Sequence, residues 1–208
     1  MADYLYAEDV NIHTRFTELS GCTLGSIDKV LAKREGLMPK LSGEQFDWGA
    51  ERHDMWAEES KRTKKVPSCF DSQFIMKLDY IEKEFATMIL PKVIVHSRPD
   101  AVSIKDETII DYKTLVADNL QEGVRKAVRT YTPARQLKFY AFQLGLHGIR
   151  IRKGIYFIEI WSKDYKEILG YHCLVLNFSF KEIASVLPWA KERIALLVSA
   201  VRAKELSA

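Results

Sequence analysis

Apolar residues recur at helical spacing in the first third of the chain. Between Thr14 and Arg34 this pattern is interrupted near Gly21 and Gly25, which predicts two short helices or one broken helix. The segment 46–62 is the next amphipathic stretch, with Asp47 as a possible N-cap. A Pro-Ser break at residues 67–68 ends this helical part.

The middle of the chain is rich in Ile, Phe, Val and Leu, which favour buried strands. We expect strands within residues 73–80 and 86–95. Residues 93–114 resemble two strands joined at the polar Lys105-Asp106-Glu107, and therefore a hairpin. Two further strands are predicted at 154–161 and 169–178.

Helical spacing returns twice in the second half. Residues 133–145 keep the i, i+3, i+4, i+7 pattern, with Pro133 in the first turn. Ser179 and Glu182 have the spacing of a capping box that opens a final helix to about residue 206, and Pro188 should kink it.

These elements predict an α/β fold with a central mixed sheet of four or five strands flanked by helices. We expect one domain over residues 1–208, because this length supports one substantial core. Its expected parts are a helical segment 1–66, a sheet core 67–178 and the C-terminal helix 179–206.

Composition limits the location and the partners of the protein. Lys and Arg outnumber Asp and Glu by only 31 to 28, so attraction to a polyanion must come from local patches such as 61–65, 125–129 and 150–153. No apolar run is long enough to cross a membrane, and the N-terminus does not resemble a signal peptide. The three cysteines are widely spaced and odd in number, which predicts reduced thiols in a cytoplasmic protein.

The predicted hairpin brings two carboxylates together. If Lys105 and Asp106 form the turn, paired residue numbers sum to 211, and Asp100 lies opposite Asp111. Opposed side chains on neighbouring strands are about 4.5–5.5 Å apart at Cβ, so two negative charges there repel each other. A divalent cation resolves this repulsion, because Mg²⁺ and Mn²⁺ favour carboxylate ligands.

Lys113 lies two residues after Asp111 and shares its strand face. A metal beside an ammonium suits phosphodiester hydrolysis, because the metal activates water and the lysine stabilises developing charge. Asp-x-Lys on a strand is more often a surface ion pair. Here Asp111 follows Ile109-Ile110 at the end of an expected buried strand, where an uncompensated carboxylate would be costly.

These residues resemble a known family. Arg98-Pro99-Asp100 followed by Asp111-Tyr112-Lys113-Thr114 is similar to the central motif of the PD-(D/E)XK nuclease superfamily, and Ile-Ile-Asp-Tyr-Lys-Thr is typical of its RecB-like branch. Upstream, Gly49 and His53 match that branch's Gly-x-x-x-His. Downstream, Gln136 and Tyr140 match its Gln-x-x-x-Tyr. The resemblance spans residues 49–140 with the motif order preserved.

The resemblance implies a restriction-endonuclease-like core and assigns roles to these residues. The expected metal ligands are His53, Asp100, Asp111 and the backbone carbonyl of Tyr112, and the expected catalytic residues are Asp100, Asp111 and Lys113. A histidine ligand favours Mn²⁺ over Mg²⁺, although both fit. Gln136 and Tyr140 share one helix face and are expected to contact DNA phosphate.

Two cofactors are not expected. The CRISPR-associated RecB-like nucleases bind an iron–sulfur cluster through one N-terminal and three C-terminal cysteines. Here Cys22 has a suitable position, but the C-terminal trio is absent. No phosphate-binding loop motif is present, so we expect no ATP-driven activity.

The leading hypothesis is therefore a metal-dependent deoxyribonuclease, an exonuclease or a single-strand endonuclease, acting on single-stranded DNA or DNA ends. A homo-oligomer is compatible with this function. One alternative is a restriction-type endonuclease or junction resolvase, against which the Gln-x-x-x-Tyr motif counts. The other is a catalytically silent DNA-binding or assembly subunit. Such a subunit would be expected to lose charged site residues, yet the complete set is present.

Overall fold

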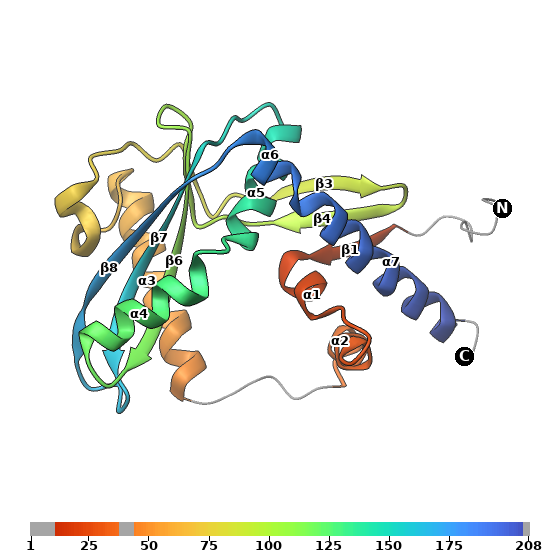
Figure 1. Cartoon of the computed structure of the whole chain (residues 1–208), viewed down its shortest axis with the longest axis horizontal. Coiled ribbons are helices and arrows are strands. Elements are labelled where there is room, and N and C mark those ends of the chain that lie inside the picture. The colour runs from red at the N-terminus through yellow and green to blue at the C-terminus, as the bar shows by residue number, and fades with distance from the viewer. Residues whose placement is uncertain (1–10, 38–43, 206–208) are drawn as a thin grey trace. The chain divides into compact units, whose positions relative to one another are not determined.

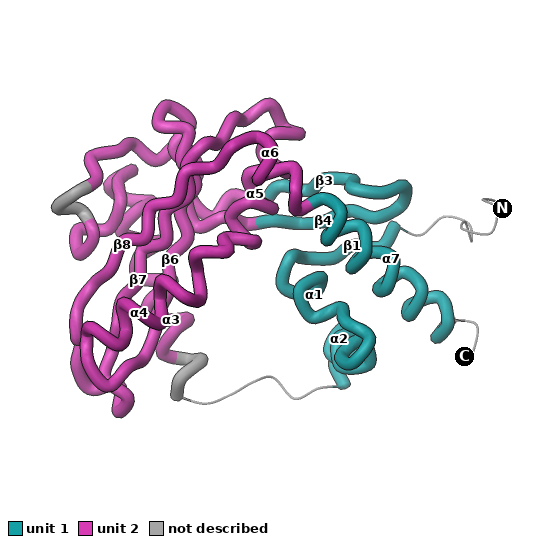
Figure 2. The backbone as a smooth tube through the Cα atoms, in the orientation of Figure 1, with its two compact units in different colours: residues 1–39, 85–97, 187–208 teal, residues 40–84, 98–186 magenta. Residues whose placement is uncertain are grey.

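The computed structural model describes residues 11–37 and 44–205. The N-terminal segment, which by its sequence does not resemble a signal peptide, lies outside the described residues. The chain divides into two compact units (Figure 2). Unit 1 comprises residues 1–39, 85–97 and 187–208, and unit 2 comprises 40–84 and 98–186. The candidate site residues all belong to unit 2.

Unit 1 holds a small sheet with the strand order β1-β4-β3, formed by β1 (Ile12–Arg15), β3 (Phe85–Leu90) and β4 (Val93–Ser97). Two short helices, α1 (Phe16–Gly21) and α2 (Ile27–Arg34), and most of α7 (Val186–Glu205) complete the unit. The two short helices match the interrupted pattern in the sequence. The strand that precedes them was not predicted.

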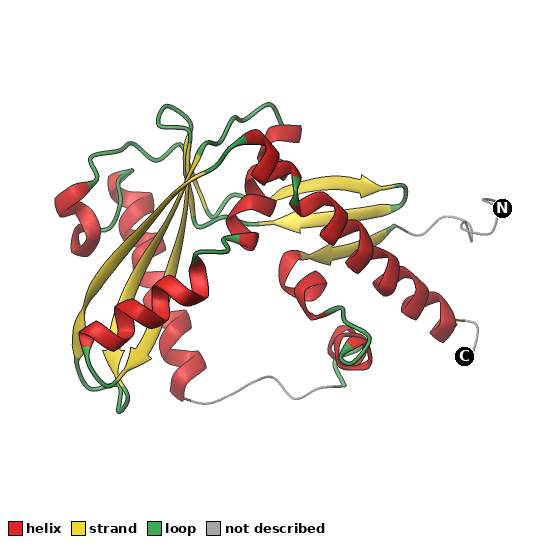
Figure 3. Ribbon diagram, viewed as in Figure 1, coloured by secondary structure: helices red, strands yellow, loops and turns green. Residues whose placement is uncertain are grey.

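Unit 2 is built on a five-stranded mixed sheet with the order β2-β5-β6-β7-β8 (Figure 3). The strands are β2 (Tyr80–Ile81), β5 (Ala101–Ser103), β6 (Thr108–Ala117), β7 (Lys153–Ser162) and β8 (Ile168–Asn177). Strands β6 and β7 run parallel, and the other pairs are antiparallel. This confirms the predicted fold class of a mixed sheet flanked by helices.

Opposite faces of this sheet carry different helices (Figure 1). Helix α3 (Glu44–Thr63) packs on the face that carries Tyr112 and Phe157, where Trp56 and Phe70 complete an aromatic core. Residues 68–73 form the 3-10 helix η1 (Ser68–Gln73). Helices α4 (Leu120–Tyr131) and α5 (Arg135–Leu146) contact the other face.

Helix α4 approaches the sheet closely because Gly123 has no side chain. A Cβ at this position would lie 2.4 Å from Ile160 Cγ2 on β7. Asn119 caps the helix, since its side chain accepts a hydrogen bond from the Glu122 N–H at 2.9 Å. The sequence analysis missed α4, although the Asn119 and Glu122 spacing was a readable signal for a helix start.

Several predicted strands are corrected by the structure. Residues 74–78 form no strand, and the apolar run 86–95 is interrupted at residues 91–92 and divides between β3 and β4. The predicted hairpin is shorter than expected, because β4 pairs with β1 and β3 and only β5 pairs with β6. Alternation of apolar residues predicts a strand but does not select its partner.

The helix ends also differ in detail from the predictions. Helix α3 begins at Glu44, so Asp47 lies inside it. Helix α5 begins at Arg135, after Ala134 with its φ of 49°. The capping box of Ser179 and Glu182 is confirmed at the start of α6 (Phe180–Ala184). The final helical segment breaks after Ala184, because the ring of Pro188 would clash with the carbonyl of the residue four positions earlier in a continuous helix.

Within residues 11–37 and 44–205, no helix is both long and apolar enough to span a bilayer.

Candidate active site

The carboxylates of Asp100 and Asp111 meet where β5 joins β6. Observed pairs are Ala101 with Ile110 and Ser103 with Thr108, so paired numbers sum to 211 as the hairpin geometry predicted. Continuing this register places Asp100 opposite Asp111. The Tyr112 N–H donates a hydrogen bond to Asp100 Oδ2 at 2.6 Å, which fixes this carboxyl group against the edge of β6.

The edge of β6 beyond this point is open. Only residues 108–110 of β6 pair with β5, and among the described residues no strand pairs with 111–117 on the side opposite β7. Two main-chain groups on this edge bond to side chains: the Tyr112 N–H donates to Asp100, and the Val116 carbonyl accepts a hydrogen bond from Lys126 Nζ at 3.1 Å. The two carboxylates therefore lie, largely buried, where the unpaired edge of β6 begins.

Lys113 supplies a positive charge to the two carboxylates. Its ammonium forms an ion pair with Asp111 Oδ2, and Asp111 is only 2% exposed. Burial by itself would lower the pKa of Lys113, but Asp111 and Asp100 raise it above its ordinary value, so the lysine is a cation at neutral pH. Burial and the charge of Asp111 raise the pKa of Asp100 to about 8.

His53 reaches the same place from α3. Its Nδ1 lies 3.8 Å from Asp100 Oδ2, and its ring meets Trp56 and Tyr112 edge-on, with centroid distances of 5.7 and 6.4 Å. Burial and the neighbouring Lys113 lower the pKa of His53. The neutral imidazole that results at pH 7 is the form that binds metals.

These groups have the donor chemistry of a divalent-cation site. Asp111 Oδ2 is buried in an ion pair with the Lys113 ammonium, and burial, followed by the charge of Asp111, raises the pKa of Asp100. In the part of the chain that the structure describes, no three His, Cys, Asp or Glu side chains are already arranged around one ion position. Instead, the carboxylate of Asp111 points at the ammonium of Lys113, with which it forms an ion pair.

The side chain and the main chain of Tyr112 belong to different environments. The phenol ring points away from the carboxylates into the aromatic core, where its hydroxyl lies 3.3 Å from Ser60 Oγ. The backbone of Tyr112 faces the open edge, where it contacts Asp100 and hydrogen-bonds with His53. The role of its carbonyl as a metal ligand stays a prediction.

Gln136 and Tyr140 lie one turn apart on α5, and Gln136 Nε2 donates a hydrogen bond to the Tyr140 hydroxyl at 3.1 Å. Tyr140 is 7% exposed, and burial raises the pKa of its hydroxyl, to which the charge of Asp111 also contributes. The pair is therefore within electrostatic range of the carboxylates. Its proposed contact with DNA phosphate stays a prediction.

Sequence analysis missed a buried ion pair beneath α3. Glu159 on β7 is fully buried and accepts two hydrogen bonds from Arg52, from Nε at 2.8 Å and from Nη2 at 2.5 Å. Trp161 Nε1 donates to the same carboxylate at 2.5 Å. Arg52 directly precedes His53, so this network holds the histidine over β6. No local sequence signal links residues that are 107 positions apart.

Two tyrosines near Asp111 were also missed. Tyr156 is the parallel partner of Asp111 in the register of β6 with β7, and its ring lies 4.9 Å from that of Tyr131 on α4. Burial and the charge of Asp111 raise the pKa of Tyr156. These rings form an apolar wall beside the carboxylates on the face covered by α4 and α5.

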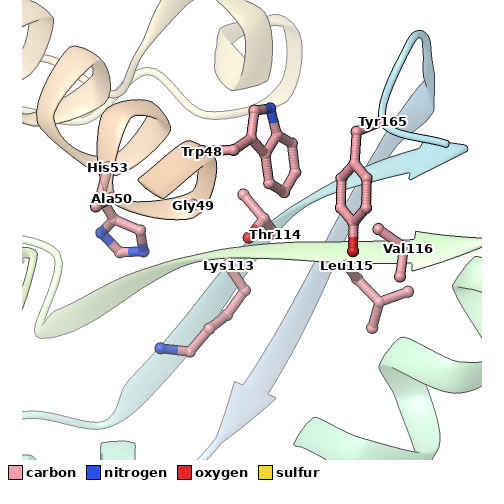
Figure 4. A pocket seen from close by; sticks show the side chains of 9 residues that line it. All are labelled: Trp48, Gly49, Ala50, His53, Lys113, Thr114, Leu115, Val116 and Tyr165. Atoms are coloured by element: carbon pink, nitrogen blue, oxygen red, sulfur yellow. The ribbon is translucent and has the colours of Figure 1, made fainter. Parts of the chain in front are cut away.

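A pocket of about 430 Å³ adjoins the carboxylates along β6 (Figure 4). Its walls come from α3, β6 and the turn between β7 and β8, and two lining residues, His53 and Lys113, belong to the candidate active site. The other lining residues are Trp48, Gly49, Ala50, Thr114, Leu115, Val116 and Tyr165.

Solved structures with a similar fold include exonucleases. No known family model and no curated protein matches the sequence. The chain is similar to the crystal structure of SSO0001, with a TM-score of 0.57, 17% identity, and coverage of 92% of this chain and 79% of that one. It is also similar to a phage-related exonuclease from Haemophilus somnus 129PT, with a TM-score of 0.55 and 8% identity. That alignment covers 92% of this chain and 97% of the exonuclease.

A third similar structure is that of LHK-Exo, an alkaline exonuclease from Laribacter hongkongensis, in complex with dAMP. The TM-score is 0.52 at 11% identity, and the alignment covers 95% of this chain and 94% of that one. At these identities the likeness concerns the fold. The chain thus has the mixed α/β fold of these exonuclease structures.

Proposed function

We propose that this protein is a divalent-metal-dependent deoxyribonuclease that acts on single-stranded DNA or on DNA ends. The observation that carries the proposal is the meeting of Asp100, Asp111 and Lys113 at the open edge of β6, with His53 beside them. The shared fold with exonucleases, one of them bound to dAMP, supports DNA as the substrate.

Each side chain has a distinct task in the proposed reaction. Asp100, Asp111 and the neutral His53 would hold Mg²⁺ or Mn²⁺, which when bound polarises the phosphate and acidifies a water. Lys113 keeps its proton at neutral pH, so it is suited to stabilise negative charge that develops on the phosphate oxygens. Gln136 and Tyr140 would position the phosphate by hydrogen bonding.

Incubation with labelled DNA tests this proposal. Purified protein is expected to cut single-stranded DNA or duplex ends with Mn²⁺ or Mg²⁺, and to be inactive in EDTA. Protein that binds DNA but cuts no form of it with either metal would instead be the silent binding subunit. Products analysed over time separate exonuclease from endonuclease activity.

We propose that the DNA backbone runs along the positive charge on α4. Arg125 and Arg129 are exposed, lie four residues apart, and have no ion-pair partner among the described residues. By contrast, Arg150 and Arg152 both pair with Glu107, with N–O distances of 3.3 and 3.1 Å. Glu107 therefore offsets part of the charge of the 150–153 cluster, whereas Arg125 and Arg129 form no ion pair among the described residues.

We therefore expect the double variant Arg125→Ala/Arg129→Ala to bind single-stranded DNA more weakly than the parent. The slope of log affinity against log salt should fall by about 0.7 for each lost phosphate contact. Fluorescence anisotropy over a salt series in EDTA measures both quantities. The matched control is Arg150→Ala/Arg152→Ala, and a larger effect in this control would contradict the proposed path.

A further inference from the structure

The pocket along β6 joins an aromatic end to the candidate active site. Figure 4 shows His53 and Lys113 at one end of the row Lys113–Val116, Tyr165 at the other, and Trp48 between them above Thr114. The Trp48 and Tyr165 rings have centroids 5.4 Å apart and an interplanar angle of 61°. Lys113 and Val116 are three residues apart on one strand, a distance of roughly 10 Å.

The lining of the pocket suits a flat group attached to an anionic chain. Trp48 and Tyr165 provide aromatic surfaces, and none of the nine lining residues is acidic. The cationic Lys113 stands at the end nearest the carboxylates. Thr114 adds a hydroxyl group to the wall. A volume of about 430 Å³ lies within the range that small-molecule sites occupy.

The span of roughly 10 Å from Lys113 to Val116 is also comparable to the distance between neighbouring nucleotides of an extended nucleic-acid chain. A phosphate held at Lys113 would leave its neighbouring nucleotide along β6, at the aromatic end of the pocket. Tryptophan and tyrosine rings bind unpaired bases by stacking, whatever the base. A base in a duplex is already stacked and paired, so these aromatic surfaces are available only to an unpaired base.

We propose that the pocket lined by Trp48 and Tyr165 binds one unpaired nucleobase of the strand whose phosphate lies at Lys113. This subsite rests on the proposed nuclease function for its orientation, and it narrows the substrate class to DNA that is single-stranded or frayed at the cut position. The pocket holds the strand in register with the carboxylates.

A substrate scan tests this subsite without altering the protein. A fluorescent 12-nucleotide single strand carries one abasic nucleotide at successive positions, and its binding is measured by anisotropy in EDTA, where no cleavage occurs. To fix the register, the strand's 5′ end is anchored to a short duplex. Abasic substitution at one position, or two adjacent ones, should weaken binding by roughly 5- to 100-fold, the range typical of a lost stacking contact.

Protein variants provide the second arm of the test. Trp48→Ala should weaken binding of the intact strand to a similar degree, and Trp48→Phe should recover most of the loss. The abasic position that matters in the parent should have no further effect in Trp48→Ala. Phe180→Ala, which removes an aromatic ring that is 86% exposed and outside the pocket, is the matched control and should bind like the parent.

Several outcomes would overturn the subsite. One is a scan in which no abasic position weakens binding more than the others. Another is an equal effect of Trp48→Ala on intact and abasic strands, which would show contact with the backbone instead of the base. Because binding is measured without metal, a protein that shows the abasic pattern but never cuts DNA would refute the nuclease proposal and leave the subsite standing.

Discussion

Replacement of Asp111 by Asn is expected to abolish metal binding and with it cleavage, whereas Lys113→Met is expected to slow cleavage by orders of magnitude while metal still binds. The carboxylate of Asp111 is buried opposite Asp100, so Asp111→Asn removes one of the two negative charges that are proposed to hold the cation. Loss of one group that stabilises transition-state charge typically costs about 10²–10³-fold in turnover.

The ion pair between Lys113 and Asp111 gives the two variants opposite expected effects on metal affinity. The ammonium of Lys113 contacts Asp111 Oδ2 and therefore competes with a divalent cation for the same oxygen. The variant Lys113→Met should bind Mn²⁺ at least as tightly as the parent protein. Calorimetric titration with Mn²⁺ and single-turnover cleavage assays on the same preparations measure the two effects.

A matched control is available on the surface. Lys163 pairs with Asp118 at 2.7 Å, and both side chains are more than half exposed, at 62% and 58%. Lys163→Met should leave metal affinity and cleavage unchanged. Equal loss of Mn²⁺ binding in Asp111→Asn and Lys113→Met would contradict the division of roles between the two residues.

Glu159→Ala is expected to be the most destabilising single change beneath α3. It leaves the Arg52 guanidinium, whose side chain is 19% exposed, without its carboxylate, and it frees the Trp161 N–H. Breaking a buried ion pair in this way typically costs about 3–5 kcal/mol of the free energy of unfolding. Urea denaturation followed by circular dichroism measures the loss.

Variants of Arg52 separate the contribution of the ion pair to stability from that of side-chain packing. Arg52→Met should cost a similar amount, because it strands a buried carboxylate, and the double variant Arg52→Met/Glu159→Leu should be more stable than either single variant. Glu58→Ala, which removes an exposed pair with Lys61 on the same helix, should change stability by less than about 1 kcal/mol. Additive losses in the double variant would show that the two residues act independently.

The hairpin that carries the proposed catalytic residues could be predicted from sequence because its geometry is local. Once Lys105 and Asp106 are taken as the turn, strand pairing alone brings Asp100 and Asp111 together, and the alternation of faces adds Lys113. His53 came from its spacing to Gly49 and from family resemblance. The structure places it beside Asp100, at 3.8 Å.

What the sequence could not supply depends on pairing between distant segments. The parallel register of β6 with β7 brings Tyr156 beside Asp111, and it places Glu159 under α3 to receive Arg52. Neither residue belongs to a motif. Likewise, the apolar alternation at 93–97 predicted a strand, but its assignment to the sheet of unit 1 follows from pairing with β1 and β3.

The open edge of β6 also bears on the solubility of the protein. Unpaired main-chain groups at a strand edge can template the addition of another extended chain, which leads to aggregation. Here Asp100 accepts a hydrogen bond from the Tyr112 N–H, and Lys126 donates one to the Val116 carbonyl. Both main-chain groups are therefore bonded, and charged side chains lie along the edge. The same carboxyl group that is proposed to hold the catalytic metal thus also protects β6 from pairing with a second copy.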